Sequence, residues 1–71
     1  MSKNILTTRE KEVFSLLVKN YTTKNIADKL YISEKTVRNH ISNVMQKLEV
    51  ESRTSAVIEL IKLGEIEIEN D

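Results

Sequence analysis

The chain has 71 residues, no cysteine, one histidine and a formal net charge of zero. Its length limits it to one small domain, and its composition excludes disulfide bonds and the His and Cys ligands of a structural zinc site. No apolar run approaches the roughly 20 residues that cross a bilayer, and nothing resembles a signal peptide. We therefore expect a cytoplasmic protein without a membrane partner, metal, cofactor or small-molecule substrate.

The first two predicted helices span residues 7–19 and 23–30. The first begins with a T-x-x-E capping box, in which Thr7 and Glu10 satisfy backbone N–H groups that a helix start leaves free. The second is short, and a turn of about three residues separates it from a third helix predicted at 34–48. Two helices joined in this way are typical of a helix-turn-helix, whose second helix enters the DNA major groove.

The helix predicted at 34–48 has two opposed faces. One face is an apolar stripe at helical spacing, formed by Val37, Ile41, Val44 and Leu48. The other is a polar, cationic stripe without a carboxylate, formed by Lys35, Arg38, Asn39, Ser42 and Gln46. Positive charge and hydrogen-bonding groups on one face are what a helix in the major groove requires.

A fourth helix is predicted at 52–63 and an acidic tail at 65–71. Apolar side chains cover more of this helix than one small core needs: Ala56, Val57, Leu60, Ile61 and Leu63. We expect them to form a twofold homodimer interface, and the alternative is that all of them pack on the first helix. The tail alternates Glu and Ile and is expected to be extended or frayed. The predicted fold class is all-α, a compact four-helix domain.

Charge is distributed unevenly along the chain. Residues 1–53 hold ten Lys and Arg against six Asp and Glu, whereas residues 54–71 hold one lysine against five acidic residues. A neutral total argues against an anionic partner, but the distribution matters more than the sum. This polarity suits a protein that approaches an anionic partner in one orientation.

Three segments resemble the LuxR/FixJ/NarL-type DNA-binding domain: LTTREKEV, TTKNIADKLYISEKTVRNHISNVMQKLEV and SRTSAVIEL. The resemblance covers about residues 6–64 and implies a transcription regulator that binds double-stranded promoter DNA and dimerises through its fourth helix. It also implies that Arg38, Asn39 and Ser42 face the bases. The similarity is strongest to a small stand-alone member from spore-forming bacteria, which implies a role at spore-coat genes late in sporulation.

The chemistry of the polar residues suits these roles. Arg38 can bind guanine O6 and N7, Asn39 can pair with adenine N6 and N7, and Ser42 discriminates less. Lys35 shares their stripe and is the fourth predicted base contact. Hydroxyl, amide, imidazole and ammonium groups donate to phosphate oxygens, and we assign this role to Thr22, Thr23, Lys24, Thr36, His40, Asn43 and Lys47. Taken singly, the other residues also fit ordinary solvated positions, and His40 fits a partly buried position in helix packing as well as it fits a phosphate contact.

Two alternative functions stay open. The chain fits the output domain of a two-component response regulator, and it fits a helical protein-interaction adaptor that uses the fourth helix and the acidic tail. An adaptor does not require the carboxylate-free stripe. An enzyme is not expected, because no nucleophile with a nearby base, carboxylate pair or phosphate loop occurs. An activator would also contact RNA polymerase, although no residue pattern identifies that surface.

Overall fold

Four helices make up the computed structural model, which describes residues 5–68. They are α1 (Thr8–Leu17), α2 (Thr23–Leu30), α3 (Glu34–Leu48) and α4 (Arg53–Lys62). Residues 5–68 contain no strand, which confirms the predicted all-α class. The helices begin and end within two residues of the predicted limits, and α2 and α3 have the predicted limits.

Each helix begins at a hydroxyl side chain that accepts a hydrogen bond from a free backbone N–H of the first turn. The four caps are Thr7, Thr22, Ser33 and Ser52. At α1 the predicted capping box is complete, since Thr7 Oγ1 accepts from the Glu10 N–H and Glu10 Oε1 accepts from the Thr7 N–H. Such caps fix helix starts from local sequence alone, which explains why the limits were predictable.

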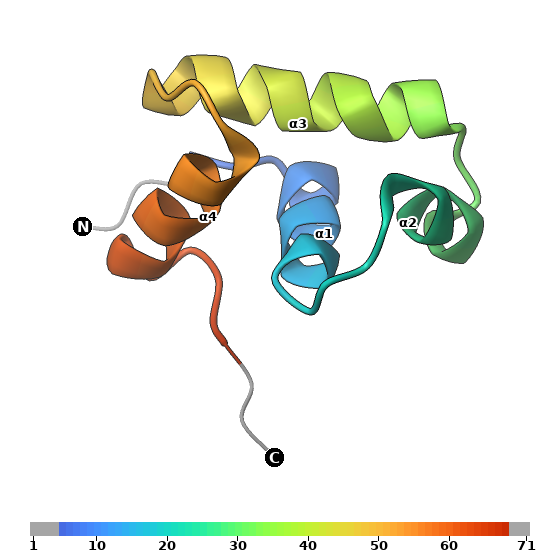
Figure 1. Ribbon diagram of the computed structural model, residues 1–71, viewed down its shortest axis with the longest axis horizontal. Coiled ribbons are helices and arrows are strands. Elements are labelled where there is room, and N and C mark those ends of the chain that lie inside the picture. The colour runs from blue at the N-terminus through green and yellow to red at the C-terminus, as the bar shows by residue number, and fades with distance from the viewer. Residues whose placement is uncertain (1–4, 69–71) are drawn as a thin grey trace.

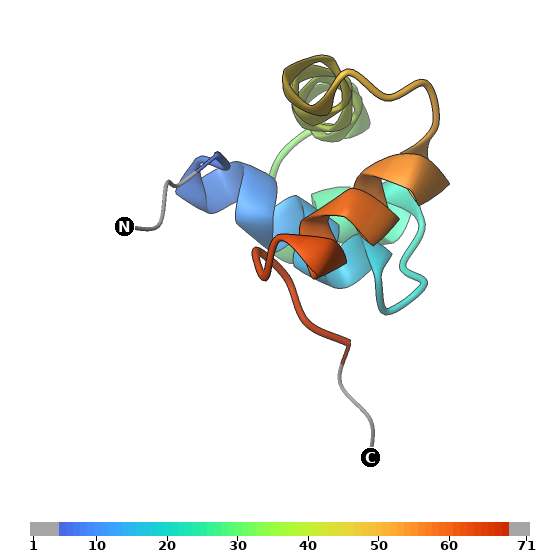
Figure 2. The same ribbon diagram turned by 90° about the vertical axis from the view of Figure 1, so that its left-hand side faces the viewer.

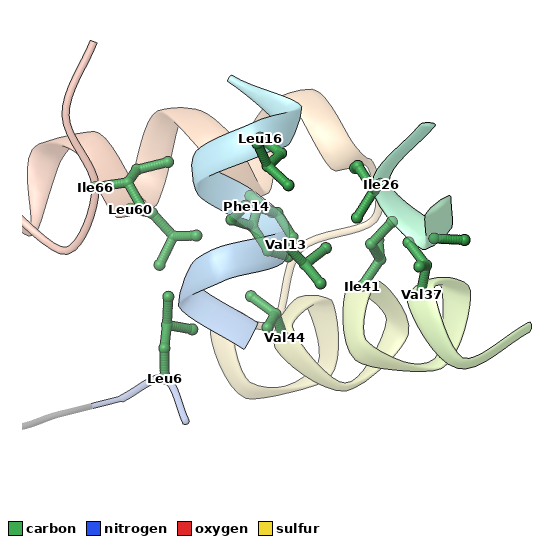
Figure 3. Close-up of a cluster of buried hydrophobic side chains, with 12 residues drawn as sticks. Leu6, Val13, Phe14, Leu16, Ile26, Val37, Ile41, Val44, Leu60 and Ile66 are labelled. Atoms are coloured by element: carbon green, nitrogen blue, oxygen red, sulfur yellow. The ribbon is translucent and has the colours of Figure 1, made fainter. Parts of the chain in front are cut away.

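The helices enclose one core. α3 lies along one side of the molecule and crosses the other three helices, against each of which it packs (Figures 1 and 2). Val13 and Phe14 of α1 are fully buried at the centre, with Ile26 of α2 and Leu60 of α4 beside them (Figure 3). The inner stripe of α3 closes the core, and its members Val37, Ile41 and Val44 are at most 2% exposed.

The chain that follows α4 is partly anchored. Ile66 is buried beside Leu60, in the core cluster that also contains the N-terminal Leu6 (Figure 3), so the expectation of a frayed tail is wrong at this residue. Residues 64–68, which include two glutamates, leave the domain on the side opposite α3 (Figures 1 and 2). The remainder of the predicted tail, residues 69–71, lies outside the described residues.

Residues 5–68 contain neither a membrane-spanning helix nor a cluster of metal-binding side chains. None of the four helices is long and apolar enough to cross a membrane. Between residues 5 and 68 no three His, Asp or Glu side chains gather in a way that would hold a metal ion.

Candidate nucleic-acid interface

The outer face of α3 is uncovered. Its predicted polar stripe is exposed at every position, namely Lys35, Arg38, Asn39, Ser42 and Gln46, and no other helix lies over it (Figure 1). The helix begins at Ser33, whose Oγ accepts from the Thr36 N–H at 3.0 Å. Burial of the opposite stripe therefore fixes the rotation of α3, and this rotation presents the polar stripe to solvent.

Three of the predicted base-contacting side chains have free hydrogen-bonding groups. Within residues 5–68, Lys35, Asn39 and Ser42 make no side-chain hydrogen bond or ion pair. A side chain with no internal partner to give up can bond a base edge without a compensating loss. Lys35, Asn39 and Ser42 can therefore bond a polar partner without first breaking a contact within the domain.

Arg38 differs, because it is paired within the domain. Its Nη1 lies 3.4 Å from Oε2 of Glu34, one turn earlier on α3, and both side chains are about half exposed. The same Glu34 oxygen accepts a hydrogen bond from Thr23 Oγ1 of α2 at 3.1 Å. A carboxylate therefore borders the stripe that was predicted to be free of carboxylates, and sequence reasoning missed its contact with Arg38. The i, i+4 spacing of the two residues was the signal that could have revealed it.

The start of α2 lies next to α3 and carries three predicted phosphate contacts. Thr22 and Lys24 are exposed, whereas Thr23 is half-buried by its contact with α3. Thr22 Oγ1 accepts from the Asn25 N–H at 3.1 Å and donates to Asn25 Oδ1 at 2.7 Å. The backbone N–H groups of a first helical turn are suited to binding an anion, so α2 can offer a phosphate its backbone as well as Lys24.

The second polar stripe of α3 is only partly open to solvent. Asn43 is exposed, whereas Thr36 and His40 are half-buried. The Thr36 hydroxyl also shares a hydrogen bond with Ser33 Oγ at 2.9 Å. These positions border the polar stripe and remain accessible to a DNA backbone beside it.

Lys47, the last predicted phosphate contact, is bound to other residues of the domain although it remains exposed at the surface. Its Nζ donates to Glu10 Oε1 at 2.5 Å and to the Ile5 carbonyl oxygen at 3.1 Å. The Glu10 side chain is 5% exposed, so its charge is nearly removed from water. We therefore assign Lys47 a structural role, because a buried carboxylate requires a close cation, and its contact with phosphate stays a prediction.

Several groups act on the Glu10 carboxyl. Burial alone would raise its pKa, but hydrogen bonds from Lys47 and the Thr7 backbone, with the nearby charge of Lys47, outweigh burial. The net effect lowers the pKa of Glu10 below 4.5. Glu10 is therefore ionised at neutral pH and binds the start of α1 to the end of α3.

The structure changes the predicted dimer surface on α4. Ala56 and Leu60 are 0% exposed and lie in the domain's own core, so neither can contact a second copy in the folded state. Val57 and Ile61 are half-buried and Leu63 is 51% exposed. Ile58, which sequence reasoning missed, is 48% exposed. It lies three residues before Ile61, a spacing that places both on one side of a helix.

Comparison with known proteins identifies the family. Residues 4–60 match the family described as "Bacterial regulatory proteins, luxR family". The chain belongs to the luxR family. It is 64% identical over 67 residues to spore germination protein GerE of Bacillus subtilis (strain 168), an alignment that covers 94% of this chain and 90% of GerE.

Two solved structures have the same fold. The structure of the transcription factor GerE matches with a TM-score of 0.92 and 55% identity, over 94% of this chain and all of that one. The response regulator ChrA of a heme-sensing two-component system matches with a TM-score of 0.83 and 32% identity, over 93% of this chain and 33% of ChrA. The chain is a GerE-like, LuxR-type DNA-binding transcription regulator and not an enzyme.

Proposed function

We propose that this luxR-family protein binds specific double-stranded DNA sequences at promoters by placing α3 in the major groove. The observation that carries the proposal is the contrast between the two faces of α3, in which an apolar stripe buried at Val37, Ile41 and Val44 lies behind a polar stripe that is exposed at every position. A helix of this kind fits the major groove and can present several side chains to the base edges.

In the proposed complex the residues divide into two groups. Base edges are contacted by Lys35, Arg38, Asn39 and Ser42. Phosphates are contacted by Thr22, Thr23, Lys24, Thr36, His40 and Asn43, and Lys47 stays a predicted phosphate contact that also binds Glu10. The acidic segment that follows α4 lies on the side away from α3 (Figure 2), so its charge is remote from the phosphates. This arrangement explains how a protein of zero net charge binds a polyanion.

We further propose a twofold dimer formed through α4. A twofold axis would place two α3 helices in successive major grooves about 34 Å apart. The proposed interface consists of Val57, Ile58, Ile61 and Leu63. Replacing Ile58 by Asp should move the protein from dimer to monomer in sedimentation, because each partner loses a buried apolar side chain worth about 1.5–3 kcal/mol. Ile68→Asp, at a residue exposed beyond α4, is the control, and wild type that stays monomeric at high concentration contradicts the interface.

The biological setting is proposed from the relatives. The 64% identity to a spore germination protein supports regulation of genes expressed late in sporulation, such as spore-coat genes. An activator would also contact RNA polymerase at those promoters. Because its target is bacterial chromosomal DNA, we place the protein in the cytoplasm, at the nucleoid.

A second candidate function is that of an output domain in a two-component response regulator. It is supported by the match to ChrA, a third of which this chain spans. The size of the native protein in its own cells, measured by immunoblot, distinguishes the two. A band near 8.2 kDa supports the free-standing regulator, and a band several times larger supports the response regulator.

The decisive experiment on DNA binding is selection of bound sequences from a random duplex pool, repeated at two salt concentrations. A specific regulator should enrich a pseudo-palindromic sequence, and its affinity should fall steeply with salt. Enrichment that is absent at both salt concentrations overturns the proposal. The selected duplex then serves as the operator in the experiments that follow.

A further inference from the structure

Glu34 is the carboxylate closest to the proposed base-reading stripe. DNA is a polyanion, so a negative charge at this position opposes association with any sequence. The domain nevertheless places Glu34 at the first position of α3, beside Arg38 and against α2. The contacts of its carboxylate with Thr23 and Arg38 indicate a role that outweighs this repulsion from DNA.

One carboxylate oxygen of Glu34 contacts both Thr23 of α2 and Arg38, the side chain proposed to read a base. Oε2 accepts from Thr23 Oγ1 of α2 at 3.1 Å and lies 3.4 Å from Arg38 Nη1. Thr23 is half-buried, so the hydrogen bond from α2 limits where the carboxylate can lie. Arg38 has no other side-chain partner among residues 5–68. The contact with Glu34 is therefore what restrains the long, flexible Arg38 side chain within this part of the chain.

The restraint leaves Arg38 able to read a base. A guanidinium group has five N–H donors, and the contact with Glu34 involves Nη1 alone. The edge formed by Nε and Nη2 remains available for guanine O6 and N7, the acceptors that arginine binds bidentately. Glu34 and guanine can thus hold the same guanidinium group from different sides.

We infer that Glu34 is a positioning residue that sets sequence specificity, because it connects Thr23 of α2 to Arg38 and orients the guanidinium group before DNA binds. The inference rests on the proposed reading role of Arg38. A side chain already restricted in the free protein loses less conformational freedom on binding. This gain in affinity applies only to sequences in which the oriented guanidinium group of Arg38 meets guanine. Repulsion between the Glu34 carboxylate and the phosphates weakens binding to all sequences alike.

Two contributions of Glu34 can therefore be separated by measurement. Its charge weakens binding to operator and non-operator DNA by the same factor, which cancels in the ratio of the two dissociation constants. Its positioning effect strengthens operator binding alone and depends on Arg38. The specificity ratio in the presence and absence of Arg38 thus isolates the positioning effect.

The experiment compares Glu34→Gln with wild type by fluorescence anisotropy, using the selected operator and a scrambled duplex of the same composition. We expect both duplexes to gain affinity from the lost charge, and the specificity ratio to fall by roughly three- to tenfold. Folding should survive because the pair is exposed and exposed pairs contribute little to stability, and thermal melting checks this. Thr23→Val, which removes the donor from α2, should lower the ratio by a smaller factor.

The matched control is Glu12→Gln. Glu12 pairs with Arg9 on α1 at 3.1 Å with similar exposure, so it has the same chemistry away from α3, and its ratio should not change. In the Arg38→Ala background, Glu34→Gln should leave the ratio unchanged. The inference is overturned if Glu34→Gln leaves the ratio unchanged in wild type. It is also overturned if the ratio falls equally without Arg38, which would make Glu34 a direct base contact, as for cytosine N4.

Failure of the proposed function has a different signature. If Arg38→Ala alone leaves the specificity ratio at its wild-type value, Arg38 does not read bases, and the reading role and the inference both fall. If Arg38→Ala lowers the ratio and Glu34→Gln does not, the reading role stands and only the inference falls.

Discussion

The two ends of α3 each carry a cation paired with a glutamate, and the pairs differ in burial. Near the C-terminal end, Lys47 contacts Glu10, whose side chain is 5% exposed, across two helices. Near the N-terminal end, Arg38 contacts Glu34, and both side chains are about half exposed on one helix. A charge removed from water must be compensated within the protein, whereas water readily solvates an exposed one. Burial therefore assigns the first pair to the fold and leaves the second available for recognition.

The largest effect on stability is expected from Lys47→Met. The substitution leaves the buried Glu10 carboxylate without its cation, and we expect unfolding free energy to fall by about 1–3 kcal/mol. The lower part of that range applies because Lys47 is 37% exposed and water screens part of its charge. Urea denaturation followed by circular dichroism measures the change.

Lys35→Met is the control on the same helix, and its exposed side chain should affect stability by no more than about 0.5 kcal/mol. DNA titrations at several salt concentrations add a second readout. A folded Lys47→Met protein should keep the wild-type salt slope if the role of Lys47 is structural alone. A slope reduced by about one would show that Lys47 also contacts phosphate.

Arg38→Ala tests the other member of the comparison. We expect operator affinity to fall by about 1–3 kcal/mol with relaxed preference at one base position in each half-site. Thermal stability should stay close to wild type, because the pair with Glu34 is exposed. Arg9→Ala removes an equally exposed pair on α1 and should change neither quantity. An Arg38→Ala protein that binds as well as wild type but unfolds more easily would reverse the roles of the two pairs.

The smallest effect is expected from pH. Because the pKa of Glu10 in the folded domain is lowered below 4.5, its ionised form favours folding. That contribution is fully present above pH 4.5 and is lost as the pH falls through the folded pKa. Glu10→Gln should therefore be less sensitive than wild type to a change from pH 7 to pH 3.5, as measured by chemical denaturation. Equal sensitivity of the two proteins would show that Glu10 does not contribute to acid unfolding.

The features that the sequence predicted well are local ones. The limits of α3 follow from the cap at Ser33, and its rotation follows from the spacing of Val37, Ile41 and Val44. Ser33 and Val44 lie within a dozen residues of each other, so predicting these features requires no knowledge of long-range contacts. The same spacing placed Arg38, Asn39 and Ser42 on the exposed face before any tertiary contact was known.

The features that the sequence did not predict depend on distant partners. Lys47 and Glu10 are 37 residues apart, and nothing near either residue distinguishes a buried pair from solvated charges. On α4, apolar residues occur on more than one side, so periodicity alone did not separate the buried Leu60 from the exposed Ile58. Ile66 likewise lies in an acidic, alternating segment whose docking on the core has no local signature. These assignments became possible once the packing of the helices was known.

The separation of the two faces of α3 has a consequence for how such regulators diversify. The residues proposed to read the promoter sequence and the residues that hold the helix in place occupy different sides of α3. If Arg38, Asn39 and Ser42 read the bases as proposed, exchanging them would change the DNA sequence that is bound without affecting the core, whereas exchanging Lys47 would remove the cation beside the buried Glu10. Duplicated copies of this gene would be free to acquire new targets by a few substitutions on one surface.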